Sequence, residues 1–307
     1  MATHNGERFV REQIESILNQ EFEAFELLVA DDASVDKTRE ILREYAASDS
    51  RIRLIFRDTP LGYVKNFEAL LNEASGDYIA LSDQDDRWHR KKILRQMEAM
   101  HQAQKETPGA ILVHSDLSLI DERGERLADS YFRKKGYRFR DEKSVAQMIS
   151  RGGVMGNTVL INRPLLNRAL PFPDKLVHHD YWLGVVAELF GRRVTISEPL
   201  VEYRVHSGNS SSRSRWWAGE YRYPWRHRWL PWRENNREEI MTHLLTCELS
   251  KEDRRLVEAF HGYLAAKKGW IFHYPTLARS GFFEGYGARI RMLLRLGIAT
   301  ILGEGTQ

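Results

Sequence analysis

Three acidic side chains, Asp83, Asp85 and Asp86, lie close together in the stretch "ALSDQDDRWHRKK". They follow the apolar run "YIAL", which is typical of a buried strand, and they precede a basic cluster. Carboxylates this close repel one another unless they share a positive partner. Mg²⁺ and Mn²⁺ prefer oxygen ligands and bind phosphate groups, so the cluster predicts a divalent-metal site. A solvated acidic turn is the alternative interpretation, because a short D-x-D pattern is common.

A second acidic pair, Asp31 and Asp32, follows the apolar run "FELLVA". Helical spacing and short apolar runs alternate through this part of the chain. The expected helices cover residues 7–20, 36–47, 64–74 and 89–104, and the expected strands cover residues 25–30, 51–56, 77–82 and 110–120. This alternation predicts an α/β fold with a mostly parallel sheet flanked by helices. Ligands bind beyond the carboxyl ends of such strands, so we expect both acidic groups to face one site.

The pattern changes from about residue 143. A glycine-rich turn, "RGGVMGN", precedes a short expected strand at residues 158–162. The run "HHDYWLGVVAELFG" predicts a helix that opens with Asp180. Residues 192–196 and 199–206 predict two further strands, and residues 234–307 predict helices.

The composition, 42% hydrophobic and 29% charged over 307 residues, is that of an ordinary globular protein. A net charge of +3 is too small to indicate a nucleic-acid partner. The single cysteine, Cys247, excludes an internal disulfide and fits a reducing compartment. No run reaches the roughly 18 to 20 apolar residues of a spanning helix, and the N-terminus has no apolar signal core. These features predict a cytoplasmic protein, with a peripheral position on the inner face of the plasma membrane as an alternative.

Residues 213–233, "RSRWWAGEYRYPWRHRWLPWR", contain six arginines, five of the eight tryptophans and one acid. Indole rings and guanidinium groups both suit a membrane interface, where they meet headgroups and phosphates. They also suit stacking on nucleic acid. A connector whose tryptophans pack against the rest of the protein is a further interpretation. The composition favours an anionic membrane surface over a packed connector, and both over nucleic acid.

Five motifs in order resemble the family-2 glycosyltransferases with a GT-A fold, especially the bacterial rhamnosyltransferase-like branch. They are "ATHNGERFVREQIESILNQ", "FELLVADDASVDKT", "GDYIALSDQDDRW", "HHDYW" and "EPLVEYRVHSGN", and they cover roughly residues 2–212. The resemblance implies a Rossmann-like GT-A domain over residues 1–212, with a nucleotide-sugar part at about 1–120 and an acceptor part at about 121–212. Residues 213–307 then form a C-terminal appendage of basic, aromatic connector and helices.

The resemblance also implies roles for residues on the donor side. Thr3 and His4 would line the pocket of the nucleotide base, although the family more often has an aromatic Tyr at the position of His4. Asp32 would accept hydrogen bonds from the base or ribose, and Lys65 and Asn66 would lie near the base and phosphates. A surface histidine and a simple turn aspartate are the alternative interpretations of His4 and Asp32.

For the reaction itself, the resemblance implies that Asp85 faces the ribose and metal and that Asp86 coordinates the metal, Mg²⁺ or Mn²⁺. His206 resembles the family's histidine near the metal and diphosphate, and Asp180 matches its general base. An ordinary loop histidine and a helix N-terminal charge favoured by the dipole are the alternatives for these two residues.

Two tryptophans, Trp88 and Trp182, either flank the acceptor sugar or belong to the core.

The resemblance implies an inverting, metal-dependent glycosyltransferase of the hexosyltransferase type, which we expect at the cytosolic face of a bacterial membrane. The "SDQDDRW" form favours deoxythymidine-diphosphate rhamnose as the donor, and a cell-surface polysaccharide or lipid-linked glycan is the expected acceptor. A non-catalytic nucleotide-sugar-binding protein of the same fold and a metal-dependent phosphohydrolase are the alternatives.

The resemblance carries one structural expectation about the N-terminus. Members of the family have a short apolar strand directly before the position of "ATHN", whereas only Met1 precedes Ala2 in this sequence. We therefore expect this strand to be missing. Its absence would leave an apolar groove open beside the neighbouring strands and would leave Thr3 and His4 on a frayed terminus.

Overall fold

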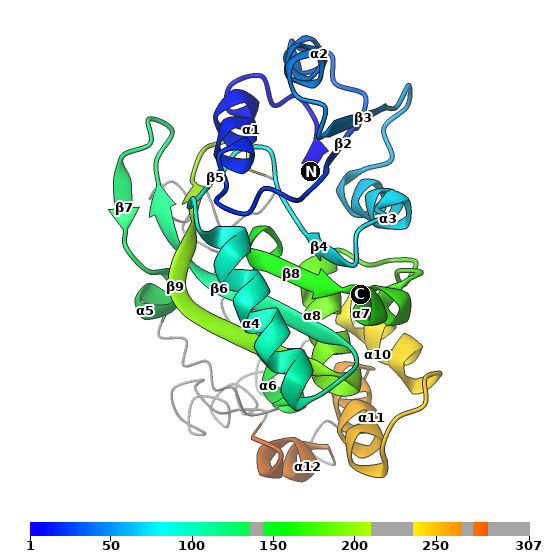
Figure 1. Cartoon of the computed structure of the whole chain (residues 1–307). Coiled ribbons are helices and arrows are strands. Elements are labelled where there is room, and N and C mark those ends of the chain that lie inside the picture. Colours follow the sequence, from blue (N-terminus) through cyan, green and yellow to red (C-terminus); the bar gives the residue numbers. More distant parts are fainter. Residues whose placement is uncertain (136–143, 210–235, 266–272, 282–307) are drawn as a thin grey trace. The chain divides into compact units, whose positions relative to one another are not determined.

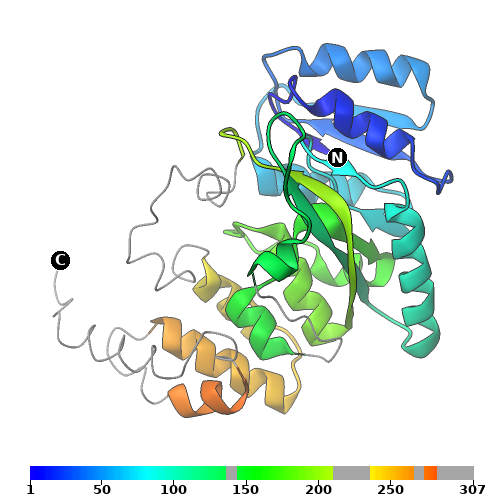
Figure 2. The same ribbon diagram turned by 90° about the vertical axis from the view of Figure 1, so that its left-hand side faces the viewer.

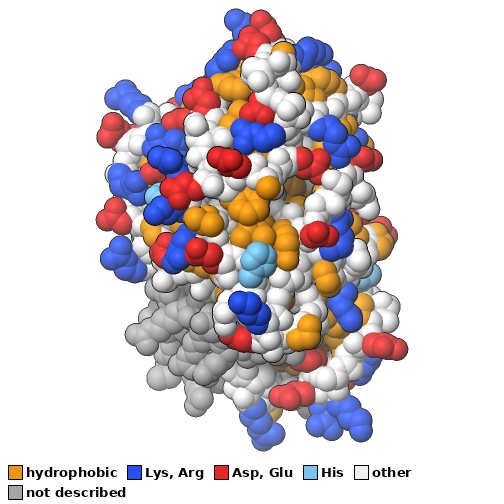
Figure 3. All heavy atoms as spheres, in the orientation of Figure 1, with side chains coloured by type: hydrophobic (Ala, Val, Ile, Leu, Met, Phe, Trp, Pro, Cys, Tyr) orange, Lys and Arg blue, Asp and Glu red, His pale blue; other side chains and the backbone are white. Residues whose placement is uncertain are grey.

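The computed structural model describes residues 1–135, 144–209, 236–265 and 273–281. The chain divides into two compact units. The first unit contains Met1–Lys143 and Gly153–Arg222, and the second contains Ser144–Gly152 and Tyr223–Gln307. Figure 3 shows acidic and basic side chains interspersed over one face of the molecule, in keeping with the small net charge.

The first unit begins with sheet A, in which three parallel strands lie in the order β1-β2-β3 (Figure 1). These strands are β1 (Ala2–Thr3), β2 (Leu27–Asp31) and β3 (Ile52–Phe56). Every residue of β2 is buried, as its unbroken apolar run predicts. The accompanying helices are α1 (Val10–Leu18), α2 (Thr38–Ser48) and α3 (Tyr63–Glu73). Val10, Ile14 and Ile17 recur on the buried face of α1, which explains why this stretch is helical.

Sheet B has the strand order β4-β8-β6-β9-β5, with β7 paired to β6. Its strands are β4 (Tyr78–Ala80), β5 (Arg87–Trp88), β6 (Ile111–Ile120), β7 (Arg126–Ala128), β8 (Val159–Asn162) and β9 (Arg192–Arg204). Only β6 and β9 pair in parallel, and the other ladders of this sheet are antiparallel. The predicted α/β fold is confirmed. The mostly parallel arrangement holds for sheet A, whereas sheet B is mixed because short connections such as that from β6 to β7 join antiparallel strands.

One long strand, β9, replaces the two strands that were predicted around Pro199. Its register against β6 shifts next to Asp116, so the predicted break is accommodated as a bulge within a continuous strand. The helices of this part are α4 (Lys92–Glu106), α5 (Tyr131–Lys135), α7 (Arg163–Ala169) and α8 (His179–Phe190), and a 3₁₀ turn, η1 (Gly156–Thr158), precedes β8. Figure 1 and Figure 2 show α4 across one face of sheet B and α8 against the other.

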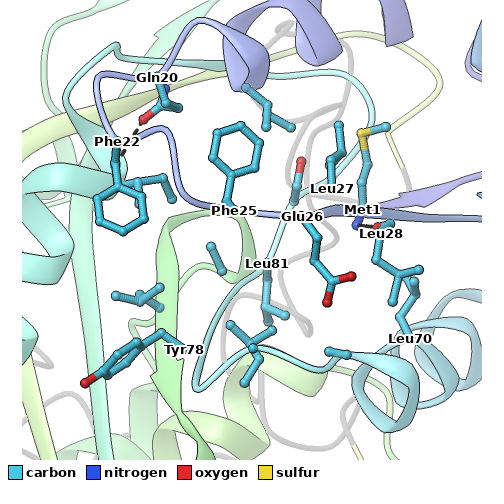
Figure 4. A pocket seen from close by; sticks show the side chains of 18 of the residues that line it. Met1, Gln20, Phe22, Phe25, Glu26, Leu27, Leu28, Leu70, Tyr78 and Leu81 are labelled. Atoms are coloured by element: carbon cyan, nitrogen blue, oxygen red, sulfur yellow. Dashed lines mark hydrogen bonds between the residues drawn. The ribbon is translucent and has the colours of Figure 1, made fainter. Parts of the chain in front are cut away.

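An apolar cavity of about 540 Å³ lies between β2 and β4 (Figure 4). Phe25, Leu28, Leu70 and Leu81 are among its lining residues. The amino group of Met1 lies beside it and donates a hydrogen bond of 2.6 Å to the carbonyl of Leu28. Burial lowers the pKa of this amino group to about 5.

The short strand β1 follows Met1, which lines this cavity. Ala2 pairs with Ala30 and Thr3 with Asp31, and the backbone N–H of Ala2 donates to the carbonyl of Ser82 at 3.3 Å. These bonds place β1 between the ends of β2 and β4. The expected fraying is thus not seen, because Met1 and Thr3 are both buried.

The described part of the second unit is helical. Its helices are α6 (Val145–Arg151), α10 (Arg237–Leu245), α11 (Lys251–Ala265) and α12 (Tyr274–Arg279). The guanidinium of Arg237 donates to the carbonyls of Ile149 and Ser150, both at 2.7 Å, and so binds the C-terminal end of α6. Cys247 is half-buried with a free thiol. Within the described ranges, no helix is long and apolar enough to cross a membrane. The tryptophan- and arginine-rich segment at 213–233 lies outside the described residues.

Candidate functional site

The acidic loop, residues 83–86, connects β4 to β5. Asp86 is completely buried, and its two carboxylate oxygens accept hydrogen bonds from the Asn157 side chain at 2.5 Å and from the Arg204 backbone at 3.1 Å. Burial, followed by the charges of Asp85 and Asp83, raises the pKa of Asp86 well above its ordinary value. The metal-ligand role predicted for Asp86 does not fit this position, because both oxygens are engaged within the protein. Asp86 instead holds the acidic loop in place through its hydrogen bonds to Asn157 and Arg204.

Asp85 and His206 come together as predicted from the motifs. Their Oδ2 and Nε2 atoms are 2.9 Å apart, and both side chains are largely buried. The backbone N–H of Gly208 donates to Nδ1 of His206 at 3.1 Å, so Nε2 carries the proton and donates to Asp85. The Arg204 side chain donates to the Asp85 carbonyl at 2.9 Å and thereby holds the loop backbone. The last residue of β9 and the loop that follows it thus position this carboxylate.

Asp83 is half-buried at the start of the loop. Burial, followed by the negative charges of Asp85 and Asp180, raises its pKa to about 7. Three carboxylates from two distant segments therefore converge, and their mutual repulsion is what a bound cation would relieve.

The oxygen-rich donor set of Asp83 and Asp85, with His206 beside it, fits a divalent cation. In the described part of the chain, no three His, Cys, Asp or Glu side chains are placed to hold a metal by themselves. A cation at this position would therefore need further ligands, and phosphate oxygens and water are the usual ones for Mg²⁺.

Asp180 lies in the first turn of α8. Its Oδ2 accepts a 3.3 Å hydrogen bond from the backbone N–H of Gly156 in η1. A Cβ atom at Gly156 would come within 2.9 Å of the His179 ring, so a glycine permits this approach. The next residue, Asn157, binds Asp86. One short turn therefore sets the position of the predicted base relative to the acidic loop.

His179 forms the wall between α8 and α3. It is completely buried, and neither ring nitrogen has a hydrogen-bond partner among the described residues. Its ring stacks on Phe67 at 4.2 Å and lies 5.1 Å from the ring of Tyr63, measured between centroids. Burial lowers the pKa of His179 to about 4, so the ring is neutral at physiological pH. This aromatic contact fixes the start of α8, and with it Asp180.

Strand ends of sheet A supply the predicted donor-side residues. The Thr3 hydroxyl donates to Asp31 at 3.1 Å. The carboxylate of Asp32 accepts hydrogen bonds from the backbone N–H groups of Leu61 and Gly62 at 2.7 and 2.8 Å. Asp32 therefore anchors the loop before α3, and its contact with a base or ribose stays a prediction.

The amide of Gln84 binds both backbone groups of His4, at 2.8 Å to the N–H and 3.0 Å to the carbonyl. His4 also contacts the Asp32 carbonyl through Nδ1 at 2.6 Å. These bonds join the acidic loop to sheet A, so the two strand-end clusters do meet. They are connected through His4, which follows β1, because β2 and β4 belong to different sheets and do not pair with each other.

Lys65 and Asn66 lie on α3 with different surroundings. The ammonium of Lys65 pairs with Glu68 at 2.6 Å on the surface. Asn66 is 1% exposed, and its amide donates to the Ala30 carbonyl and accepts from the Arg57 side chain. Asn66 therefore supports the end of β2 and does not face a ligand in this structure. The phosphate contact of Lys65 stays a prediction.

Of the two interpretations of Trp88 and Trp182, the structure favours core residues over acceptor contacts. Trp88 is 8% exposed and packs in the main hydrophobic cluster, with the Lys92 ammonium 3.7 Å from its ring centroid. Trp182 is 2% exposed, and its indole N–H donates to the Ala169 carbonyl at 2.8 Å. Rings enclosed in this way cannot contact an acceptor sugar.

Four residues of the site were missed in the sequence: Gln84, Asn157, Tyr63 and Arg204. Gln84 lies inside the quoted acidic motif, and Arg204 stands two positions before His206, so position was the available signal for both. Asn157 ends the glycine-rich turn that was noted only as a turn. Tyr63 carries no motif of its own.

Comparison with known proteins places these features in a family. The family model described as glycosyl transferase family 2 matches residues 1–166. TuaG of Bacillus subtilis, which is named for teichuronic acid biosynthesis, is 26% identical over 241 residues, covering 78% of this chain and 88% of TuaG.

Solved structures show the same fold. A crystal structure of TarS from S. aureus in complex with UDP-GlcNAc has a TM-score of 0.53 at 16% identity, covering 92% of this chain and 71% of TarS. The mannosyltransferase PcManGT from Pyrobaculum calidifontis, in complex with GDP-Man and Mn²⁺, has a TM-score of 0.54 at 18% identity, covering 99% of this chain and 79% of that chain. At these identities the likeness establishes the GT-A arrangement of the chain alone.

Proposed function

The chain belongs to glycosyl transferase family 2, and on that premise we propose that it transfers a sugar from a nucleoside-diphosphate donor to an acceptor hydroxyl with inversion of the anomeric centre. The observation that carries the proposal is that one turn, η1, binds Asp180 through Gly156 and the acidic loop through Asn157, beside the Asp85–His206 pair. Carboxylates that can hold a cation, together with a separate carboxylate on another segment, suit a reaction with an anionic leaving group and a hydroxyl nucleophile.

Asp83 and Asp85, with His206 adjacent, are the residues that would hold a divalent cation. When bound, Mg²⁺ or Mn²⁺ would neutralise the charge that develops on the diphosphate as the glycosidic bond breaks. Mn²⁺ is the ion to test first, because PcManGT forms its complex with GDP-Man and this ion. His206 keeps Asp85 oriented through its Nε2 proton, and Arg204 holds the loop backbone.

Asp180 is the proposed base. Its carboxylate is held at the start of α8 by the N–H of Gly156, and it lies on a segment separate from the acidic loop. An acceptor hydroxyl is a weak nucleophile until its proton is removed, and Asp180 would take this proton during the attack. A single displacement from the face opposite the leaving group inverts the anomeric carbon.

Similarity to other glycosyltransferases suggests which donor sugars and which acceptors to test first. The branch resemblance makes deoxythymidine-diphosphate rhamnose the first donor to test, and the complexes of TarS and PcManGT add UDP-GlcNAc and GDP-mannose. The name of TuaG supports a cell-surface polysaccharide or lipid-linked glycan as the acceptor. We assign donor binding to about residues 1–120, where Thr3, His4, Asp32 and Lys65 remain the proposed donor contacts, and acceptor binding to about residues 121–212.

We also propose that residues 213–233 dock on an anionic membrane surface. Their six arginines and five tryptophans support this. Each basic residue near such a surface contributes about 1 kcal/mol, and salt weakens the attraction. Liposome co-sedimentation should therefore increase with anionic lipid content and decrease with ionic strength. Sedimentation that ignores both would favour a packed connector.

The activity test is a panel of nucleotide sugars with and without Mn²⁺ or Mg²⁺, measuring release of the nucleoside diphosphate. We expect cation-dependent release from at least one donor. Binding without any release would indicate a non-catalytic binding protein, and release of inorganic phosphate from simple phosphate esters would indicate a phosphohydrolase.

A further inference from the structure

Tyr63 is the first residue of α3 and one of the large hydrophobic residues that stay open, with 39% of its surface exposed. The residue before it, Gly62, has a φ of 83°, a conformation that favours glycine. The carboxylate of Asp32 binds the N–H groups of Leu61 and Gly62 and so holds this turn in place. The backbone directly before Tyr63 is therefore fixed by hydrogen bonds to Asp32.

The ring of Tyr63 rests on a buried aromatic base. Its centroid lies 5.2 Å from Phe67 and 5.1 Å from His179, and these two rings are stacked and almost completely buried. Such a base limits how far the Tyr63 ring can move. One part of the ring packs against it, and the exposed part remains free for another partner.

The hydroxyl of Tyr63 lies within electrostatic reach of both halves of the site. Burial, then the charges of Asp83 and Asp180, raises its pKa well above the ordinary value, and Asp85 adds to the effect. The hydroxyl therefore stays protonated and can donate a hydrogen bond. The His179 ring that Tyr63 contacts belongs to the residue directly before Asp180, so Tyr63 lies beside the proposed base.

We propose that Tyr63 is a specificity-determining residue that contacts the sugar being transferred, with its exposed ring face against the sugar and its hydroxyl donating to a sugar oxygen. The inference rests on the proposed function, because it assumes that diphosphate lies at Asp83 and Asp85 and that the acceptor hydroxyl lies at Asp180. The transferred sugar must then lie between these groups, and Tyr63 lies beside the second of them through its contact with His179. Sugars present both an apolar C–H face and hydroxyl acceptors, and a tyrosine offers one partner for each.

Two variants separate the ring from the hydroxyl: Tyr63→Phe keeps the aromatic contact, and Tyr63→Ala removes both. Tyr45→Phe is the matched control, because it removes the hydroxyl of a tyrosine that lies on α2, where it donates to Glu15. The measurements are kcat/KM across the donor panel and the Kd of the free nucleoside diphosphate, which lacks the sugar.

We expect Tyr63→Ala to lower kcat/KM for the preferred donor about tenfold or more, whereas the Kd of the free nucleoside diphosphate changes less than about twofold. Tyr63→Phe should lose less and should change the order of preference among donors that differ in one hydroxyl. Tyr45→Phe should behave as the wild type. Equal losses for sugar donor and free nucleotide, or unchanged activity and donor order in both variants, would overturn the inference. If the wild type neither binds nor turns over any nucleotide sugar, the proposed function fails as well, and this outcome is distinguishable from the other two.

Discussion

Two regions meet near Ser82 and differ in almost every physical respect. One is the apolar cavity between β2 and β4, and the other is the acidic site formed by Asp83, Asp85 and Asp180. Ser82 lines the cavity, and the next residue begins the acidic loop. The cavity has volume and little charge, whereas the acidic site has concentrated charge.

The two regions lower the stability of the protein for different reasons. Volume lined by side chains such as Leu28 and Leu81 marks incomplete packing, which affects stability. Carboxylates that raise one another's pKa mark a place where folding free energy is given up for chemistry. We therefore expect changes at the acidic site to affect catalysis first, and changes at the cavity to affect stability alone.

Removal of divalent cations should have the largest effect. If the acidic site needs a cation to offset its own repulsion and the leaving group's charge, excess chelator should abolish transfer, and added Mn²⁺ or Mg²⁺ should restore it. The melting temperature of the wild type should change far less than its activity. Full turnover in excess chelator would remove the metal from the mechanism.

Asp180→Asn should come next. The amide keeps the shape of the side chain and removes its basicity, so donor and cation binding should stay near normal. Transfer should fall by about 10² to 10⁴, as for other positioned bases. Asp58→Asn, at an exposed aspartate of sheet A's neighbouring loop, is the control and should retain activity. Transfer within a few-fold of the wild type would place the base elsewhere.

Much of this division was predictable from the sequence because it depends on local pattern. The all-apolar run of β2 and the motif positions of Asp85, Asp180 and His206 were sufficient to place strands and site residues. The parallel order of sheet A followed from alternating elements. Each of these signals lies within a short stretch of residues.

The sequence was a poor guide where the orientation or exposure of a side chain depends on packing between segments that are far apart in the chain. Neighbouring side chains in a non-helical loop diverge, so Asp85 faces the site while Asp86 points to Asn157 and Arg204. Whether a tryptophan is exposed or enclosed depends on elements far away in the chain, and this is why the sequence left two interpretations of Trp88 open. Tyr63 gains its significance from His179, a contact between α3 and α8 that no local pattern contains.

The cavity offers the converse test, in which stability changes and the chemistry does not. Attaching about five alternating Val and Ile residues ahead of Met1 should extend β1 into the cavity and convert its buried amino group into an amide. We expect the melting temperature to rise by about 5 °C or more, because apolar side chains would fill space that now contains none. An extension of equal length made of Gly and Ser is the control. Equal gains from both extensions would mean that the change acts through the amino group and not through the cavity.

Asp83→Asn is the change at the acidic site that we expect to raise stability. The pKa of Asp83 is raised from 3.8 to about 7, so the folded protein binds more protons than the unfolded chain between these values. Stability is therefore lost as pH rises through this window, and the loss is complete above pH 7. A shift of this size implies roughly 4 kcal/mol at most, and partial exposure reduces it to about 2 kcal/mol.

The variant removes this loss, so without cations it should melt about 4 to 8 °C above the wild type at pH 8 and close to it at pH 4. Mn²⁺ should narrow the difference at pH 8 by stabilising the wild type, which keeps all of its carboxylates. Thermal unfolding of Asp83→Asn, Asp58→Asn and wild type at the two pH values checks this. A gap of equal size at both pH values would show that packing, and not the repulsion among Asp83, Asp85 and Asp180, limits stability at the site. Packing would then limit stability at the acidic site as it does at the cavity, and the two regions would differ less than we infer.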